Sequence, residues 1–186
     1  AAWNLCGRLG ADGLGVDAAH MAAIVDAPPG ADEWHRRALD LAEASEEPDA
    51  RRWRGSLANN MGWAAHDAGR FEEALELFES AVAFRAEADD EGGLRIARWT
   101  VARAKRSLGR LEEALDEQRD LQVEMAAAGV PEDGYVSEEI GELLFALDRP
   151  DEARPHFAAA ARLLAGDPWL VEHEPERIER LRDLSG

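Results

Sequence analysis

The feature that most constrains this chain is an internal repeat with a period near 40 residues. Three segments of equal length align, over residues 61–84, 101–124 and 140–163. The first small residues of these segments, Gly62, Ala102 and Gly141, are separated by 40 and then 39 positions. A repeat of this length predicts similar structural units that stack on one another, because a single unit cannot bury its own apolar face.

Each repeat predicts two helices joined by a tight turn. The turn residues are Gly69, Gly109 and Asp148, which tolerate the left-handed backbone conformation that ends a helix. Small or apolar residues then recur seven positions apart in each second helix, and they are Ala74, Ala81, Ala114, Leu121, Ala153 and Ala160. Such residues let paired helices approach closely, while larger apolar side chains fill the space beside them.

Composition supports helices throughout the chain. Alanine dominates the apolar residues, β-branched residues are few, and no segment alternates apolar and polar residues for the length of a strand. The 186 residues with 46% hydrophobic content are enough for a short array of repeats. We therefore predict an all-α fold, an α–α superhelix built of antiparallel helix pairs.

These repeat positions resemble those of the tetratricopeptide repeat family, over about residues 55–165. The period exceeds the usual ~34 residues of that family. It is similar to the long-period subclass of kinesin light chains and of the peptide-sensing Rap regulators of bacteria. The resemblance implies one solenoid domain with repeats at about 55–90, 94–130 and 133–165.

The N-terminal residues 1–54 fit the repeat less well, and we expect a degenerate or truncated part of the solenoid there. Residues 16–25 and 31–45 are predicted helices joined by Pro28, Pro29 and Gly30. Residues 1–9 are a predicted last helix of an upstream pair, with 10–15 as its link, which favours a trimmed chain. The basic cluster at 51–56 is expected to pack Trp53 between helices and to pair its arginines with residues 45–49.

The last part of the chain, residues 166–186, predicts a capping helix. Residues 175–184 place Ile178, Leu181 and Leu184 on one apolar stripe. Solenoids need such a cap to cover their last apolar face. Docking of this helix onto a partner is the alternative.

The family resemblance implies a concave groove lined by the first helix of each pair, where a partner binds. The family's groove-facing positions fall on Asn59, Trp63, His66, Trp99, Arg103, Arg106, Tyr135, Glu138, Glu142 and Phe145, with Asp17 and His20 by a looser alignment. Exposed Trp, Tyr and Arg concentrate binding energy at protein interfaces. The alternative for Trp63 and Trp99 is a core position between neighbouring repeats.

A stretch of positive charge crosses this predicted groove. The chain has a net charge of −18, yet residues 94–111 contain no acid and hold Arg95, Arg98, Arg103, Lys105, Arg106 and Arg110. Arg95, Arg103 and Arg106 share one helical face, so Arg95 joins the predicted groove residues. Such a stripe favours a carboxylate, from an acidic side chain or a peptide C-terminus. Alternatively, these bases pair with acids of adjacent helices, such as Glu72, Glu73, Glu138 or Glu142.

The remaining sequence features argue against other functions. The acidic net charge disfavours nucleic acid and anionic membranes, and no apolar run is long enough to span a bilayer. The five histidines never occur at metal-ligand spacings, and the sequence has no glycine-rich phosphate loop. We therefore predict no enzyme activity, no metal and no cofactor. The single cysteine, Cys6, excludes an intrachain disulfide and favours a reducing, cytoplasmic compartment.

The sequence thus predicts a non-catalytic scaffold that binds a protein or peptide segment, acidic or with a free C-terminus, in its groove. Two alternatives stay open. One is a peptide-sensing regulatory module of a larger protein, motivated by the long period. The other is a self-assembling structural unit, a homo-oligomer that associates through its N-terminal end or through residues 175–184.

Overall fold

The computed structural model describes residues 1–27 and 29–186, and every regular element in this part of the chain is a helix. In chain order the helices are α1 (Ala2–Leu9), α2 (Asp12–Val25), α3 (Gly30–Ala44), α4 (Pro48–Arg51), α5 (Arg54–Asp67), α6 (Phe71–Glu87), α7 (Glu91–Ser107), α8 (Leu111–Ala127), α9 (Gly134–Ala146), α10 (Pro150–Leu164), α11 (Pro168–His173) and α12 (Pro175–Ser185). Pro28, which belongs to the predicted joint between the first helices, lies outside the described residues. No described helix has the length and apolar character needed to cross a membrane.

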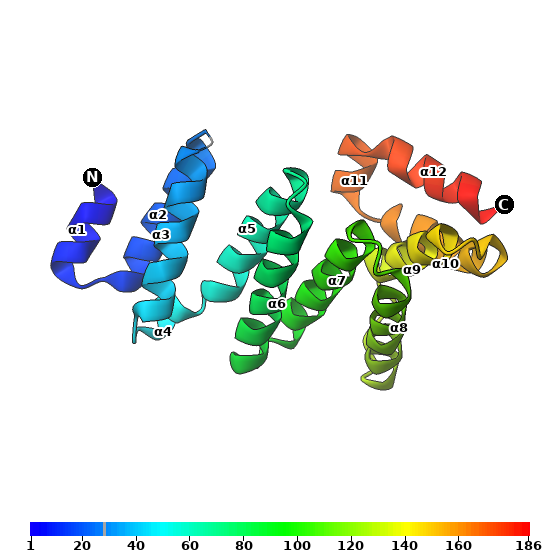
Figure 1. The fold of residues 1–186 in the computed structure, drawn as a ribbon, viewed down its shortest axis with the longest axis horizontal. Helices are drawn as coiled ribbons and strands as arrows, with labels where there is room; N and C mark the ends of the chain where they lie inside the picture. Colours follow the sequence, from blue (N-terminus) through cyan, green and yellow to red (C-terminus); the bar gives the residue numbers. More distant parts are fainter. Residues whose placement is uncertain (28) are drawn as a thin grey trace. The chain divides into compact units, whose positions relative to one another are not determined.

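Two compact units divide the chain, residues 1–97 and 98–186, and the boundary between them falls inside α7. Consecutive helices pack as pairs within each unit (Figure 1). In the first unit α2 packs on α3 and α5 packs on α6, and in the second unit α9 packs on α10. The predicted helix pair is therefore the building block of the fold.

The predicted turn residues adopt the left-handed conformation. The backbone φ angles are 75° at Gly69, 76° at Gly109 and 58° at Asp148. Each residue follows the first helix of a repeat and precedes the second, so the chain reverses there without a long loop. Pro150 starts α10, where its missing N–H costs no hydrogen bond.

Glycine in the first helix allows a phenylalanine of the second helix to press against the backbone. A Cβ atom added to Gly62 would lie 2.4 Å from Cε1 of Phe78, and one added to Gly141 would lie 2.8 Å from Cδ1 of Phe157. Both rings are fully buried. The close approach that the small residues predicted is thus confirmed in two repeats.

The middle repeat packs its two helices with different residues at these positions. Its equivalent positions hold Ala102 and Gln118, and both side chains are fully buried. Gln118 donates a hydrogen bond of 3.4 Å to the carbonyl oxygen of Arg98, while its Oε1 atom has no hydrogen-bond partner among the described residues. A buried polar group without a partner destabilises a fold, so the middle repeat is packed less favourably than its neighbours.

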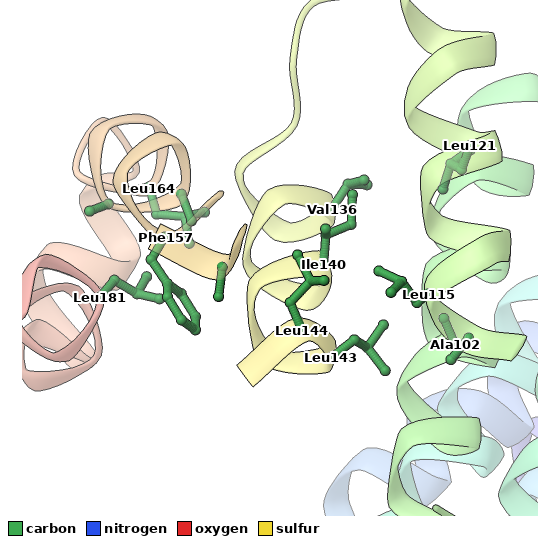
Figure 2. Packing of buried hydrophobic residues seen from close by; sticks show 14 of the residues in the cluster. Ala102, Leu115, Leu121, Val136, Ile140, Leu143, Leu144, Phe157, Leu164 and Leu181 are labelled. Atoms are coloured by element: carbon green, nitrogen blue, oxygen red, sulfur yellow. The ribbon is translucent and has the colours of Figure 1, made fainter. Parts of the chain in front are cut away.

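The second unit has the larger core, to which α8, α9, α10 and α12 contribute most residues and α7 and α11 one each. Figure 2 shows Val136 and Ile140 of α9 directed toward Leu115 of α8, and Phe157 of α10 beside Leu181 of α12. In the first unit, one core cluster combines residues of α2, α3, α4 and α5, and another joins α5, α6 and the first part of α7. Most residues of these smaller clusters are alanines, in accord with the composition.

The N-terminal prediction requires a correction. The link was expected to span residues 10–15, but α2 already begins at Asp12. The glycines there serve close packing rather than a loop, since a Cβ atom on Gly13 would lie 3.0 Å from Cβ of Asp49, and one on Gly15 would lie 3.0 Å from Cδ2 of Leu41. The predicted helices over 1–9, 16–25 and 31–45 are present as α1, α2 and α3. The short helices α4 and α11 were not predicted.

The basic cluster at 51–56 pairs differently from the expectation. Arg52 does contact Asp49, at 3.2 Å. Arg51 and Arg54 instead contact the two carboxylate oxygens of Glu87 at the end of α6, at 2.7 and 3.0 Å. Arg54 also lies over the ring of Phe84, so this cluster ties α4 and α5 to α6.

Candidate functional site

The predicted groove residues of the first unit lie on α5 and are partly used in packing. The Trp63 ring meets Phe78 edge to face at 5.4 Å, and His66 lies 5.1 Å from the ring of Phe71. Both α5 side chains are half-buried. Asn59 is half-buried too, and its Oδ1 atom is buried without a hydrogen-bond partner among the described residues. These residues therefore contribute to the contact of α5 with α6.

In the second unit, Trp99 of α7 and Tyr135 of α9 form an aromatic pair. Their rings meet edge to face at 5.6 Å, and Nε1 of Trp99 donates a hydrogen bond of 3.1 Å to the carbonyl oxygen of Tyr135. Asp133 caps α9 by accepting hydrogen bonds from the backbone of the first turn, which positions Tyr135 at the start of the helix. Burial raises the pKa of the Tyr135 hydroxyl, which donates to Asp167 at 3.4 Å.

Five of the six bases between residues 94 and 111 have an ion-pair partner. The pairs are Arg95 with Glu91, Arg98 with Glu124, Lys105 with Glu113 and Glu117, Arg106 with Glu139, and Arg110 with Glu113. Intramolecular pairing therefore describes most of the positive stretch. The partners come largely from α8 and from Glu139, and not from the four glutamates that the sequence suggested.

Arg103 is the sixth base, and its side chain has neither an ion pair nor a hydrogen bond within the part of the chain that the structure describes. The side chain is half-buried. Burial and the neighbouring charge of Arg106 lower the pKa of the Arg103 guanidinium. Three carboxylates of α9 act on it from nearby without direct contact, and they are Glu138, Glu139 and Glu142.

Each of these three carboxylates is held by a different arginine. Glu139 is only 2% exposed, and Arg106 contacts both of its oxygens, at 2.6 and 3.1 Å. Burial raises the pKa of the Glu139 carboxyl, and the Arg106 charge opposes that rise. The other two carboxylates are held by α12. Arg103 is therefore the base on this face that makes no direct contact with a carboxylate among the described residues.

The predicted groove residues Glu138 and Glu142 face α12. Arg177 donates to both oxygens of Glu138, at 2.9 and 2.7 Å, and Arg180 donates to both oxygens of Glu142. The hydrogen bonds to Glu138 raise the pKa of the Arg177 guanidinium, which also lies 5.5 Å from the centre of the Tyr135 ring. The sequence contained no local signal for this contact, because Glu138 and Arg177 are 39 positions apart and lie on helices that only tertiary packing brings together.

The chemistry that this face offers is the binding of an anion. A half-buried guanidinium without a carboxylate partner can donate two parallel hydrogen bonds to a carboxylate. The aromatic pair Trp99 and Tyr135 lies on the same two helices. Within the described residues, no group of three or more His, Cys, Asp or Glu side chains is arranged to hold a metal ion.

Both the repeat and the fold of this chain resemble those of known proteins. Residues 19–87 match the family model of the tetratricopeptide repeat. This match lies within the first unit, and it includes residues 19–54 of the N-terminal part that fits the repeat less well. No curated protein sequence matches the chain.

Solved structures with a similar fold include BtubC (BKLC) from P. vanneervenii, with a TM-score of 0.61, 17% identity, and coverage of 98% of this chain and 87% of that one. The TPR-like repeats of a putative kinesin light chain from Podosopora anserina also match, with a TM-score of 0.51, 17% identity, and coverage of 96% and 93%. At these identities the likeness shows the fold. Together with the helix pairs, the comparisons confirm the predicted all-α α–α superhelix class and the resemblance to kinesin light chain-type repeats.

Proposed function

We propose that this chain, a protein of tetratricopeptide-type helical repeats, is a scaffold that binds a protein segment through one carboxylate at Arg103. Repeats of this type commonly mediate protein–protein interaction and are generally non-catalytic. The fold alone does not identify a ligand, so the proposal depends on the chemistry of one face. That face consists of the second part of α7 and of α9.

The observation that carries the proposal is the missing partner of Arg103. Removing a charge from water is costly unless the charge is paired and hydrogen-bonded. Arg103 is half-buried, and the carboxylates around it, Glu138, Glu139 and Glu142, are each bound by another arginine. A carboxylate from a partner would supply the missing hydrogen bonds of the Arg103 guanidinium.

The charge of the whole chain limits the ligand further. A net charge of −18 repels a strongly acidic segment over long distances. The proposed ligand is therefore a segment with a single carboxylate at the site, either one acidic side chain or a free C-terminus. The neighbouring rings of Trp99 and Tyr135 would contact the apolar part of that segment.

Fluorescence anisotropy with matched peptides tests the proposal. A labelled peptide library is measured in two forms, with a free C-terminal carboxylate and with a C-terminal amide, and each acidic residue is also replaced by its amide. The peptides that bind should lose affinity roughly tenfold when the carboxylate that reaches Arg103 is neutralised, because a hydrogen bond to a charged group contributes about 1.5–3 kcal/mol.

Two variants make the test specific. Arg103→Gln should lower the affinity of these peptides roughly tenfold and abolish the preference for the carboxylate form. Arg110→Gln is the matched control, because Arg110 is exposed and forms a local pair with Glu113 three residues along the chain. Equal effects of the two variants would contradict a site at Arg103.

A further inference from the structure

The first unit carries an apolar stripe on α2 that no described residue covers. Leu14, Met21 and Ile24 expose 66%, 50% and 60% of their surface, and Val25 exposes 81%. Asp17 is exposed within the same row. We name the residues Leu14, Asp17, Met21, Ile24 and Val25 the α2 stripe. The opposite face of the helix supplies the buried residues that pack on α3, so α2 is apolar on both sides.

The next first helix of the same unit does not share this feature. The exposed residues of α5 are Asn60, Ala64 and Asp67, which are polar or small. Both helices are paired with a second helix in the same way, α2 with α3 and α5 with α6. The repeat therefore does not require large apolar residues on this outer face. Their concentration on α2 indicates a contact that α5 does not make.

The spacing of the α2 stripe is that of a helix-pairing seam. Leu14, Asp17, Met21 and Ile24 follow one another at intervals of three, four and three residues. Alternating intervals of three and four residues form the row that one helix presents to another in a coiled coil. A single polar residue in such a row sets the register of the partner helix and selects what lies opposite. Asp17 occupies that position, and it has no ion pair or hydrogen bond within the described residues.

A pocket beside the α2 stripe carries further negative charge. The pocket has a volume of about 530 Å³, and its lining includes Leu14 and Asp17 of the stripe together with Glu47, Asp49, Arg52 and Trp53. Arg52 is bound to Asp49 at 3.2 Å, and Glu47 accepts a hydrogen bond of 2.9 Å from the backbone of Gly13. The pocket therefore keeps an excess of negative charge next to an aromatic ring. Such a surface fits the side chain of lysine or arginine.

The charge of this surface distinguishes two candidate occupants of the α2 stripe, a second copy of this chain and a helix of another protein. A second copy of this chain would bring a second net charge of −18 to the contact, which opposes association. A basic helix meets both the apolar row and the unpaired Asp17. We propose that the α2 stripe and its pocket dock an amphipathic helix of another protein, which places a lysine or arginine opposite Asp17. This surface lies in the first unit and is independent of the carboxylate site at Arg103 in the second.

Two synthetic helical peptides test this proposal by fluorescence anisotropy. Both have leucine at every seam position except one, which is lysine in the first peptide and glutamate in the second. We expect the lysine peptide to bind the unmodified protein at least about tenfold more tightly than the glutamate peptide, since like charges across a contact are unfavourable. Equal affinities for the two peptides would overturn the proposal.

Three variants locate the binding and separate it from general attraction to an acidic protein. Met21→Asp should weaken binding of the lysine peptide about tenfold, because it places a charge in the apolar row. Ala64→Asp adds the same charge to the exposed face of α5 and should change the affinity less than twofold. Asp17→Lys should reverse the preference, so that the glutamate peptide binds more tightly. Far-UV circular dichroism and thermal unfolding of all three should match those of the parent protein, because the replaced side chains are exposed.

Sedimentation equilibrium tests whether a second copy of this chain, and not another protein, occupies the α2 stripe. If the protein forms a dimer that Met21→Asp dissociates, the α2 stripe belongs to a second copy and the proposal is overturned. If the protein stays monomeric and Met21→Asp leaves peptide binding unchanged, the stripe is not the docking surface. A monomer with the expected response to all three variants supports a basic helical partner.

Discussion

Two helices of this protein, α2 and α9, differ in what covers the side chains that do not pack on their paired helix. On α9, the carboxylates of Glu138 and Glu142 are bound by Arg177 and Arg180 of α12. On α2, an exposed row of side chains is mostly apolar, and no described helix covers this α2 stripe. The comparison shows that α12 covers side chains of α9 through ion pairs, whereas no described helix covers the α2 stripe.

The closed face of α9 depends on apolar burial first and on ion pairs second. Ile178 and Leu181 of α12 are buried in the core that α10 shares. The arginines of α12 then add charge-assisted contacts at the edge of that core. Burial of a leucine side chain stabilises by about 1.5–3 kcal/mol, more than an exposed ion pair does.

The largest effect is expected when the apolar contact of α12 is broken. Leu181→Asp removes a fully buried leucine beside Phe157 and places a charge in the core. We expect the free energy of unfolding to fall by about 4 kcal/mol, measured by urea denaturation. Arg182→Asp on the exposed side of the same helix is the control and should change it by less than about 0.5 kcal/mol. A similar loss in both variants would mean that α12 does not depend on its apolar stripe.

The next effect concerns the pair of Arg177 and Glu138. The Glu138 side chain is 12% exposed, so Arg177→Met leaves a carboxylate in a largely buried place without its partner. Breaking a fully buried pair lowers the free energy of unfolding by up to about 3–5 kcal/mol. Because Arg177 is partly exposed, we expect a loss of about 2 kcal/mol. The double variant Arg177→Met with Glu138→Met should recover most of this loss in a double-mutant cycle. An additive loss would refute a direct coupling between the two residues.

The pair of Arg180 and Glu142 should contribute less. Glu142 is 14% exposed, nearly as buried as Glu138, but the Arg180 side chain is 51% exposed against 28% for Arg177, so water and salt screen the Arg180 charge more strongly. Arg180→Ala is expected to lower the free energy of unfolding by less than about 1 kcal/mol. The loss of unfolding free energy relative to the parent protein should be smaller in about 0.5 M NaCl, where the Debye length is only a few ångströms. A loss as large as that of Arg177→Met would show that burial of the carboxylate, and not exposure of the arginine, decides the contribution of each pair.

The smallest effect on the free energy of unfolding is expected for a substitution in the α2 stripe. Met21→Ser replaces a residue of the α2 stripe that is 50% exposed. The free energy of unfolding should change by less than about 0.5 kcal/mol, because no described contact is lost. Thermal unfolding at two protein concentrations provides the measurement. A stabilisation that grows with concentration and disappears in the variant would reveal a second copy on the stripe.

Much of the repeat could be predicted from residue types alone. The turns at Gly69, Gly109 and Asp148 follow from the few residues that accept a positive φ. Gly62 and Gly141 predicted the close approach to a second helix, since only a residue without a side chain leaves room for Phe78 and Phe157. The long link expected before residue 16 was wrong because glycine serves both loops and tight packing, and only the neighbours of Gly13 and Gly15 distinguish the two uses.

The candidate sites could be predicted only in part. The sequence indicated an arginine stripe and a set of groove positions, and these assignments stay predictions, as do the regulatory and self-assembling alternatives. It did not indicate that α12 engages Glu138 and Glu142, because helices 30 or more residues apart are matched by three-dimensional packing and not by local spacing. The apolar α2 stripe was also missed, since the period of a helix does not tell which of two apolar faces is buried.

The sequence by itself determined the helices, their turns and the positions where paired helices touch, because these depend on backbone conformation and side-chain volume. The tertiary structure alone decided which arginine binds which glutamate. Arg106 contacts Glu139 and leaves Arg103 without a partner, although several carboxylates were available to both. Ion pairs need atoms within about 4 Å of each other. That distance is set by how whole helices pack, and no pattern within a single helix specifies it.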